Sequence, residues 1–453
     1  MSVILAYCLF VPIAALCFAR LSLRAAILAV LIGGWWALPV ARYPPGATGT
    51  LLPWWISGIA LPTDMVLTKA WIPPLVAFIG AALRDPASVR QWRPGAIDLP
   101  MAGWCLWPLI AGLGKISDPP GLVASFYVTG GWGLAWLLGR IWLGGAEGRL
   151  ALMRALALSG LANLPVAIIE GTRPAMLYGL VYGPHPYRFD GIERYIGYRP
   201  LGFFENGNLY GLWSALAAFA ALWIARRDLP SRRWIALMVL NVVIALASQS
   251  IGAILLLGAG LGLLWLWQRP LFLPAMAAAA AGSILLAAVH LSGVIPLQSI
   301  ARTPAGERAI AAMRAIGRGS LLWRVSQDAK ALPIIKQHPL IGSARWDWWR
   351  PIRTRPAGQA MLLIGQFGLF GLMLAWGGLI AACGTALVRL RHMGERGAAG
   401  DAALPLAIIV LLALADAALN AFFFFPAVVA AGAIAATAVG RRPERANRVD
   451  RAA

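Results

Sequence analysis

The feature that most constrains this chain is a succession of long apolar runs, each close to the length that crosses a lipid bilayer. A transmembrane helix needs about 20 apolar residues, and roughly 17 to 25 are tolerated. The runs fall at 2–19, 25–41, 64–83, 98–114, 121–143, 150–170, 207–225, 233–249, 250–268, 271–293, 359–388, 402–419 and 422–440. Because lipid cannot satisfy an open sheet edge, spanning segments must be helical. We therefore expect an all-α, polytopic membrane protein with about 12–13 transmembrane helices.

The composition excludes a soluble fold. Of the 453 residues, 60% are hydrophobic and only 13% are charged, whereas soluble domains carry about 25% charged residues. The net charge of +21 would suggest nucleic acid as the partner of a soluble protein. Here arginine-rich connections that orient membrane helices explain much of that charge, and nothing resembles a nucleic-acid-binding module.

The apolar runs divide the chain into four parts. In order along the chain they are residues 1–293 with ten helices and the connection 171–206, a long polar loop at 294–358, three helices within 359–440, and a basic tail at 441–453. One further stretch, 50–62, is too short to span and is expected to be interfacial or re-entrant.

Lysine and arginine residues mark every second connection between the runs. They are Arg20 and Arg24; Arg84, Arg90 and Arg93; Arg140 and Arg149; Arg226, Arg227, Arg232 and Arg233; Arg269; Arg389, Arg391 and Arg396; and in the tail Arg441, Arg442, Arg445, Arg448 and Arg451. Short basic connections stay in the cytoplasm, so the N-terminus is expected outside. The connections 171–206 and 294–358 then face the outside, with the turn at Ser248–Ser250.

The long loop at 294–358 is unusually basic for an external segment. Its cations outnumber its three acidic residues, Glu307, Asp328 and Asp347, and they are Arg302, Arg308, Arg314, Arg318, Arg324, Lys330, Lys336, Arg345, Arg350, Arg353 and Arg355. Long loops translocate largely regardless of charge, so topology permits this loop but does not explain it. An anionic ligand would explain it.

Two polar stretches carry candidate sites. At 199–213 the chain reads RPLGFFENGNLYGLW, where Asn206 or Asn208 can cap the following helix; alternatively Arg199, Glu205 and the two asparagines line a polar site at the outer membrane face. At 321–342 an amphipathic helix is expected to stop at a proline turn. Its apolar face has helical spacing and its charged residues point elsewhere; these are Leu322, Val325, Ala329 and Leu332, against Arg324, Asp328 and Lys330.

Together these stretches resemble the superfamily of bacterial O-antigen ligases and Wzy-type O-antigen or exopolysaccharide polymerases. The family's pattern of Arg, Gly, Phe and Asn-Pro-Asn is matched by Arg199, Gly202, Phe204, Asn206 and Asn208, with Gly207 in place of proline. Its loop arginine, followed fourteen residues on by His-Pro-Leu and then Gly, is matched by Arg324, His338, Pro339, Leu340 and Gly342. The helix after the loop supplies Gln366, Gly368, Leu369 and Gly371.

The resemblance spans roughly 150–440 and has two departures. The family's histidine falls at about Ala357, and its Ser-Arg pair appears as Ser250-Ile251. The resemblance implies a GT-C-like fold in the bacterial inner membrane with its active site facing the periplasm. It implies polymerisation of undecaprenyl-pyrophosphate-linked repeats into a surface polysaccharide or exopolysaccharide, or transfer of such a glycan to a lipid or protein acceptor. The departures favour the polymerase, because polymerases vary more.

The resemblance also implies the chemistry and the partners. Such glycosyltransferases work without a metal or another cofactor, and Arg199 and Arg324 would stabilise the leaving pyrophosphate through their bidentate forks. Membrane lipid, a flippase and a chain-length regulator are the implied partners. A transporter or flippase of lipid-linked glycan is the alternative from another class, and it would show inverted repeats and Gly- or Pro-broken helices. A degenerate family member that binds without catalysis is a third alternative, because the family's histidine is absent.

The remaining candidate residues serve as base or in substrate binding. Glu205 is preferred as general base over Asp347, His185 and His338. The substrate-binding candidates are Asn206, Asn208, Lys69, Arg345, Arg350 and Gln366. Lys69 could instead pair with Asp64.

Several other residues have two readings each. The run RWDWWRP at 345–351 is expected in an interfacial belt, with stacking on sugar rings as the alternative. Glu170 is a candidate partner for Arg173. Asp416, inside an apolar run, is either functional or paired within the bundle.

Overall fold

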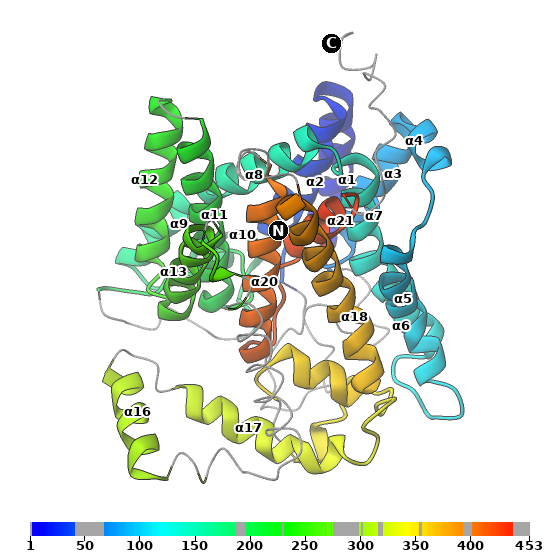
Figure 1. The fold of residues 1–453 in the computed structure, drawn as a ribbon, viewed down its shortest axis with the longest axis vertical. Helices are drawn as coiled ribbons and strands as arrows, with labels where there is room; N and C mark the ends of the chain where they lie inside the picture. Colours follow the sequence, from blue (N-terminus) through cyan, green and yellow to red (C-terminus); the bar gives the residue numbers. More distant parts are fainter. Residues whose placement is uncertain are drawn as a thin grey trace.

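The computed structural model describes residues 2–40, 68–186, 196–228, 231–267, 269–272, 274, 299, 302–315, 320–352, 356–392 and 401–437. Within these ranges every regular element is a helix (Figure 1), and the only β-type pairing is an isolated bridge between Asp118 and Arg345. The all-α class is confirmed for this part of the chain. The stretch 50–62, Asp64, nearly all of the run 271–293, and the tail 441–453 lie outside the described residues.

Five helical segments are long and apolar enough to cross a membrane, which suggests a multi-pass membrane protein. They are α1 (Val3–Arg20), the continuous segment of α6 (Gly121–Val128), η3 (Thr129–Gly133) and α7 (Leu134–Trp142), the segment of α8 (Ala146–Ser159), η4 (Gly160–Ala162) and α9 (Asn163–Thr172), α11 (Gly207–Arg227), and α18 (Gln359–His392). Shorter apolar helices pack among them: α2 (Leu23–Ala37), α3 (Ile72–Arg84), α5 (Leu99–Ala111), α13 (Ile251–Leu266), α20 (Ala403–Leu419) and α21 (Pro426–Ala435). The other helices are α4 (Pro86–Gln91), η2 (Ala96–Asp98), α10 (Leu177–Tyr182), α12 (Arg232–Ala247), α16 (Pro304–Ala315), α17 (Ser320–Ile335) and η5 (Arg350–Ile352).

Prolines move three helix boundaries away from those of the apolar runs. The run 422–440 is not helical throughout, because α21 begins only at Pro426, a position where proline's fixed φ suits the first turn. The run 150–170 is interrupted by the 3₁₀ turn at 160–162, since Pro165 lacks the N–H that would bond four residues back. The third helix begins at Ile72 rather than near 64, so Lys69 lies in the turn before it.

The helix α18 is broken at Gly368, and the break is a docking point. Gly368 has φ +72°, and a Cβ there would strike the backbone of Leu340; Gly342 has φ +79°, and a Cβ there would strike the backbone of Gln366. The two turns therefore interlock, with the Ala344 N–H donating to Gln366 O at 2.8 Å. Two motifs that the sequence keeps apart, 338–342 and 366–371, form one structural unit.

The described connections gather at two ends of the bundle. At one end Arg84 donates to the carbonyls of Phe18 and Leu21, and two ion pairs join other basic connections, Arg24–Glu147 at 2.7 Å and Arg149–Asp401 at 2.6 Å. At the other end Lys115 donates to Gly342 O at 2.6 Å and the Trp346 N–H donates to Asp118 O at 2.8 Å. Figure 1 shows α17 at the end of the molecule opposite α4. The basic connections that carry Arg24, Arg84 and Arg149 thus lie together at one end of the described structure.

The helix α11 is the most enclosed of the candidate spans, with 89% of its 18-residue window buried. It packs against α8, α12 and α13. The turn before α13 approaches α11 closely at Gly211, because a Cβ at this position would strike the side chain of Ser250. The segment at 199–208, which carries the first motif, leads directly into this central helix.

A buried carboxylate holds both ends of the connection that precedes α11. Glu170, fully buried, accepts four backbone N–H bonds, from Met176 and Leu177 on one oxygen and from Leu201 and Gly202 on the other, at 2.7 to 3.0 Å. The suggested pairing of Glu170 with Arg173 is therefore wrong. Both of its oxygens already accept from these backbone N–H groups, which need an acceptor in an apolar setting.

The Glu170→Gln substitution is expected to lower the free energy of unfolding by about 3 kcal/mol, because hydrogen bonds to a charged acceptor are worth about 1.5–3 kcal/mol each. Unfolding of the detergent-solubilised protein, followed by tryptophan fluorescence, measures this. The control is Glu147→Gln, which removes a carboxylate that is 77% exposed and should change stability little. Equal effects of the two substitutions would contradict the role assigned to Glu170.

Candidate functional site

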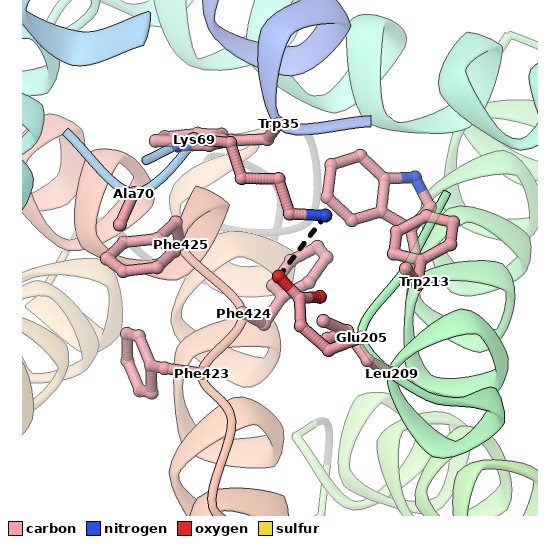
Figure 2. A pocket seen from close by; sticks show the side chains of 10 residues that line it. Trp35, Lys69, Ala70, Glu205, Leu209, Trp213, Phe423, Phe424 and Phe425 are labelled. Carbon is pink, nitrogen blue, oxygen red and sulfur yellow. Dashed lines mark ion pairs between the residues drawn. The ribbon is translucent and has the colours of Figure 1, made fainter. Parts of the chain in front are cut away.

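An aromatic pocket with one ion pair lies where four distant parts of the chain meet. Its walls are the end of α2, the turn before α3, the start of α11 and the segment before α21 (Figure 2). It is a small pocket, partly open to the outside. The lining residues are Trp35, Lys69, Ala70, Phe204, Glu205, Leu209, Trp213, Phe423, Phe424 and Phe425.

Lys69 and Glu205 form the ion pair inside this pocket. Lys69 Nζ lies 3.2 Å from Glu205 Oε1, and the two side chains are 8% and 3% exposed. The ammonium also donates to Phe203 O at 2.9 Å and lies 5.5 Å from the centre of the Phe204 ring. Two residues that the sequence assigned to different roles are therefore one electrostatic unit, and the expected alternative pairing with Asp64 is not needed to neutralise Lys69.

Two buried polar atoms of the pocket have no hydrogen-bond partner among the described residues. One is the second carboxylate oxygen, Glu205 Oε2, and the other is the indole nitrogen Trp35 Nε1. Figure 2 shows Glu205 Oε1 turned toward Lys69 while Oε2 points away from it, on the side of Leu209. The first atom is an acceptor and the second is a donor, so the pocket presents both kinds of polar group without a protein partner.

Arg199 lies at the entrance to α11. Its Nη2 donates to Asn208 Oδ1 at 2.6 Å, and its guanidinium packs against Gly207, where a Cβ would approach Arg199 Nε to 2.6 Å. A glycine at position 207 thus makes room for the Arg199 side chain. The preceding backbone is held by Gln249, whose Nε2 donates to the carbonyls of Ile196 and Tyr198.

Asn206 is the N-cap of α11, as the pattern predicted. Its Oδ1 accepts from the N–H groups of Asn208 at 2.9 Å and Leu209 at 3.0 Å. This occupies the first free donors of the helix. Glu205, next to the cap, therefore stands at the N-terminal end of α11, which is the positive end of the helix dipole.

Arg324 bonds the end of α20 instead of standing free in the loop. Its Nη1 donates to Leu419 O at 2.7 Å and to Asn420 Oδ1 at 2.5 Å, and Asn420 Nδ2 donates to Asp416 Oδ1 at 2.8 Å. Asp416 is thus paired within the bundle. The segment that starts at Asn420 continues into Phe423–Phe425, which line the pocket. The residue that Arg324 bonds is therefore only a few positions away from the pocket wall along the chain.

The helix α17 turns a face inward that the apolar pattern did not predict. Asp328 was expected to point away from the packed face, but it is buried, and its Oδ1 accepts from the Ala357 N–H at 3.0 Å. Gln327 is also buried, together with Ala331 and Ile335. The apolar pattern gave the wrong direction for Asp328, because a side-chain-to-backbone hydrogen bond, and not apolar burial alone, helps to orient α17.

Arg345 and Arg350 share one carboxylate in a separate cluster. Asp347 lies 3.0 Å from Arg345 and 3.3 Å from Arg350. The neighbouring indoles Trp346, Trp348 and Trp349 are buried, Trp349 to 1% exposure. These tryptophans are core residues, so neither the interfacial belt nor exposed stacking on sugar describes them. Within the cluster, Trp346 donates to Asp118 through its backbone N–H and its indole nitrogen, and Trp348 Nε1 donates to Leu362 O.

The remaining candidates fall in three places. Gln366 is buried in the interlocked turns. His338 is exposed in the turn after α17, with its carbonyl accepting from the Gly342 N–H. His185 Nε2 lies 3.1 Å from Phe204 O, beside the pocket. Among the four candidate bases, only Glu205 lines it.

The aromatic wall of the pocket was not identified from the sequence. The run Phe422–Phe425 immediately before Pro426 was a usable signal, because a proline that starts a helix leaves the preceding residues outside it. Trp35 and Trp213 gave no such signal, since a tryptophan within an apolar run is equally suited to core and cavity.

Among the residues that the structure describes, no group of three or more His, Cys, Asp or Glu side chains could hold a metal ion. The arrangement offers instead a carboxylate for a hydroxyl proton, fixed arginine forks for an anion, and aromatic faces. A comparison with models of protein families finds no match, and no curated protein sequence matches the chain.

Replacement of one member of the buried Lys69–Glu205 pair should be far more destabilising than replacement of both. Removal of one partner of a buried pair costs about 3–5 kcal/mol, because the other charge stays buried. We expect Lys69→Met to lose about that much, and the double variant Lys69→Met with Glu205→Gln to regain about 1–3 kcal/mol.

Equilibrium unfolding of the four proteins of this double-mutant cycle measures the coupling. The control is the same double-mutant cycle at the exposed pair Arg24–Glu147, with Arg24→Met and Glu147→Gln. Additive losses at Lys69 and Glu205 would show that the two charges are not coupled.

Proposed function

We propose that the protein is a Wzy-like polymerase. It would join undecaprenyl-pyrophosphate-linked oligosaccharide repeats into a surface polysaccharide or exopolysaccharide at the periplasmic face of the bacterial inner membrane. In that setting it would span the membrane about 12–13 times, as the apolar runs predict. The proposal rests on the resemblance in its motifs and on the chemistry that the pocket makes available.

The observation that carries the proposal is the convergence of motif residues at one end of the bundle. Glu205 and Arg199 flank the start of α11, and Arg324 bonds the segment that continues into the pocket wall. Residues that act on one substrate must lie close together, and these come from parts of the chain that are distant in sequence. The basic connections lie at the opposite end, which suits an external site under the positive-inside bias.

Each residue has a role in the proposed transfer. An acceptor sugar hydroxyl attacks the anomeric carbon of the donor, the bond from that carbon to the pyrophosphate oxygen breaks, and the lipid pyrophosphate leaves. Glu205 takes the hydroxyl proton. Arg199 and Arg324 stabilise the charge that develops on the leaving pyrophosphate, which their planar forks can bind at two oxygens.

Two alternatives keep specific support. Transfer of the finished glycan to a lipid or protein acceptor would use the same residues and differ only in the acceptor. A flippase of lipid-linked glycan is the other, and the helix breaks at Gly160–Ala162 and Gly368 are features that transporters share.

Deletion of the gene in its native host, followed by analysis of lipid-linked glycans, separates these functions. Single repeat units on undecaprenyl pyrophosphate, retained at the periplasmic face without long polymer, are expected for the polymerase. Full-length polymer still on undecaprenyl would indicate a ligase, and repeat units held at the cytoplasmic face would indicate a flippase. Unchanged glycans would reject all three.

The arginine roles are tested by substitution in the complemented deletion strain. Arg324→Ala and Arg199→Ala should each reduce polymer at least about 100-fold at unchanged protein abundance, as for loss of one charge-stabilising donor. Arg308→Ala, in the exposed helix α16 of the same loop, is the matched control and should leave polymer unchanged. If Arg324→Lys retains full activity, the two-point binding of pyrophosphate is wrong.

A further inference from the structure

Five arginines gather around the turn between α11 and α12, far from the pocket. α11 is 21 residues long, so its last turn lies about 30 Å from its first. Figure 1 shows the turn between α11 and α12 at the same end of the molecule as α4. We call this group the turn cluster, and it consists of Arg154 from α8, Arg226 and Arg227 at the end of α11, and Arg232 and Arg233 at the start of α12.

The turn cluster has one acidic neighbour among the residues that the structure describes. Asp228 lies 3.2 Å from Arg154 and 3.9 Å from Arg227. The other three arginines are exposed and have no described ion-pair partner. Five positive charges against one negative charge leave a net charge of +4 at this turn. An anion would neutralise part of it.

The position of two of these arginines disfavours their own helix. Arg232 and Arg233 are the first two residues of α12, whose first turn has no acidic residue and no side-chain cap. The N-terminal end of a helix is the positive end of its dipole, so cations there lower helix stability. Charges that only orient the helices in a membrane could stand anywhere in the connection. The placement of these two is therefore better explained by something that they bind.

Indole rings and an apolar stripe border the turn cluster. The guanidinium of Arg227 lies 5.6 Å from the centre of the Trp223 ring, and that of Arg154 lies 5.9 Å from the centre of the Trp234 ring. Tryptophan and arginine are typical of the boundary between lipid headgroups and hydrocarbon. From this boundary α12 presents an apolar stripe at helical spacing, with side chains between 36% and 54% exposed: Ile235, Val239, Val243 and Leu246.

We propose that the turn cluster and the apolar stripe of α12 bind an anionic phospholipid of the membrane leaflet at this end of the protein. The phosphate lies among Arg226, Arg232 and Arg233, and an acyl chain follows the stripe. A soluble polyanion would neutralise the arginines but would leave the stripe uncovered, so a lipid is the occupant that matches both. This site does not rest on the proposed function, because it lies at the other end of α11 from the pocket.

Native mass spectrometry of the full-length, detergent-solubilised protein, titrated with lipid, measures the binding. The probes are dioleoylphosphatidylglycerol, which is anionic, and dioleoylphosphatidylcholine, which has the same chains and no net charge. The anionic lipid should bind at least about tenfold more tightly, because each arginine near a lipid phosphate contributes to its attraction. Equal affinities for the two lipids would overturn the proposal.

Matched variants locate the lipid. The double variant Arg232→Gln with Arg233→Gln should weaken binding of phosphatidylglycerol at least about tenfold and leave binding of phosphatidylcholine unchanged. The control is Arg90→Gln with Arg93→Gln, which removes two exposed arginines from another basic connection and should change affinity by less than about twofold. Equal losses in the two double variants would show a diffuse attraction to net positive charge and would overturn the proposal.

Thermal unfolding in lipid nanodiscs separates lipid binding from a role in the fold. In phosphatidylcholine, the Arg232→Gln, Arg233→Gln variant should unfold at the same temperature as the unchanged protein or a higher one, because two cations leave the positive end of α12. In phosphatidylglycerol, the unchanged protein should be the more stable of the two, because only it binds the lipid tightly. An equal difference between the two proteins in both lipids would show that the arginines act within the fold, and the proposal would fail.

Discussion

Backbone groups that lie outside helices have no helical hydrogen-bond partner, and the need to supply one shapes the end of the bundle that carries the site. Glu170 accepts from four of these N–H groups, Gln249 bonds two carbonyls, and Asn206 caps α11. These three side chains fix the path of the segment from which Arg199 and Glu205 project. Residues that hold the backbone and residues with a candidate chemical role thus lie along one short segment. A substitution that weakens the backbone hydrogen bonds will therefore also displace Arg199 and Glu205.

The site separates two electrostatic environments that lie close together. Inside the pocket, Lys69 and Glu205 form a buried ion pair among aromatic side chains. Outside it, Arg199 donates to Asn208 Oδ1, and Arg324 donates to Asn420 Oδ1 and to Leu419 O. The ion pair and the two arginines therefore form separate sets of contacts.

The sequence predicted the features that depend on local pattern. Apolar runs set the helical class, and the asparagine at the start of α11 was recognisable as a cap. Features that depend on tertiary contact were not readable: the Lys69–Glu205 pair joins residues far apart in the chain, and Asp328 faces inward, where it accepts from the Ala357 N–H. The tryptophans at 346–349 were misassigned, because an aromatic run suits an interfacial belt and a core equally well until its neighbours are known.

The segment that leaves Asn420 sets a fixed spacing between the two environments. Asn420 bonds Arg324, and Phe424 lines the pocket four residues later, so their Cα atoms can be at most about 14 Å apart even in a fully extended chain. A connecting segment this short sets an upper limit on their separation. The aromatic wall of the pocket and the arginine anchor can therefore not move far apart.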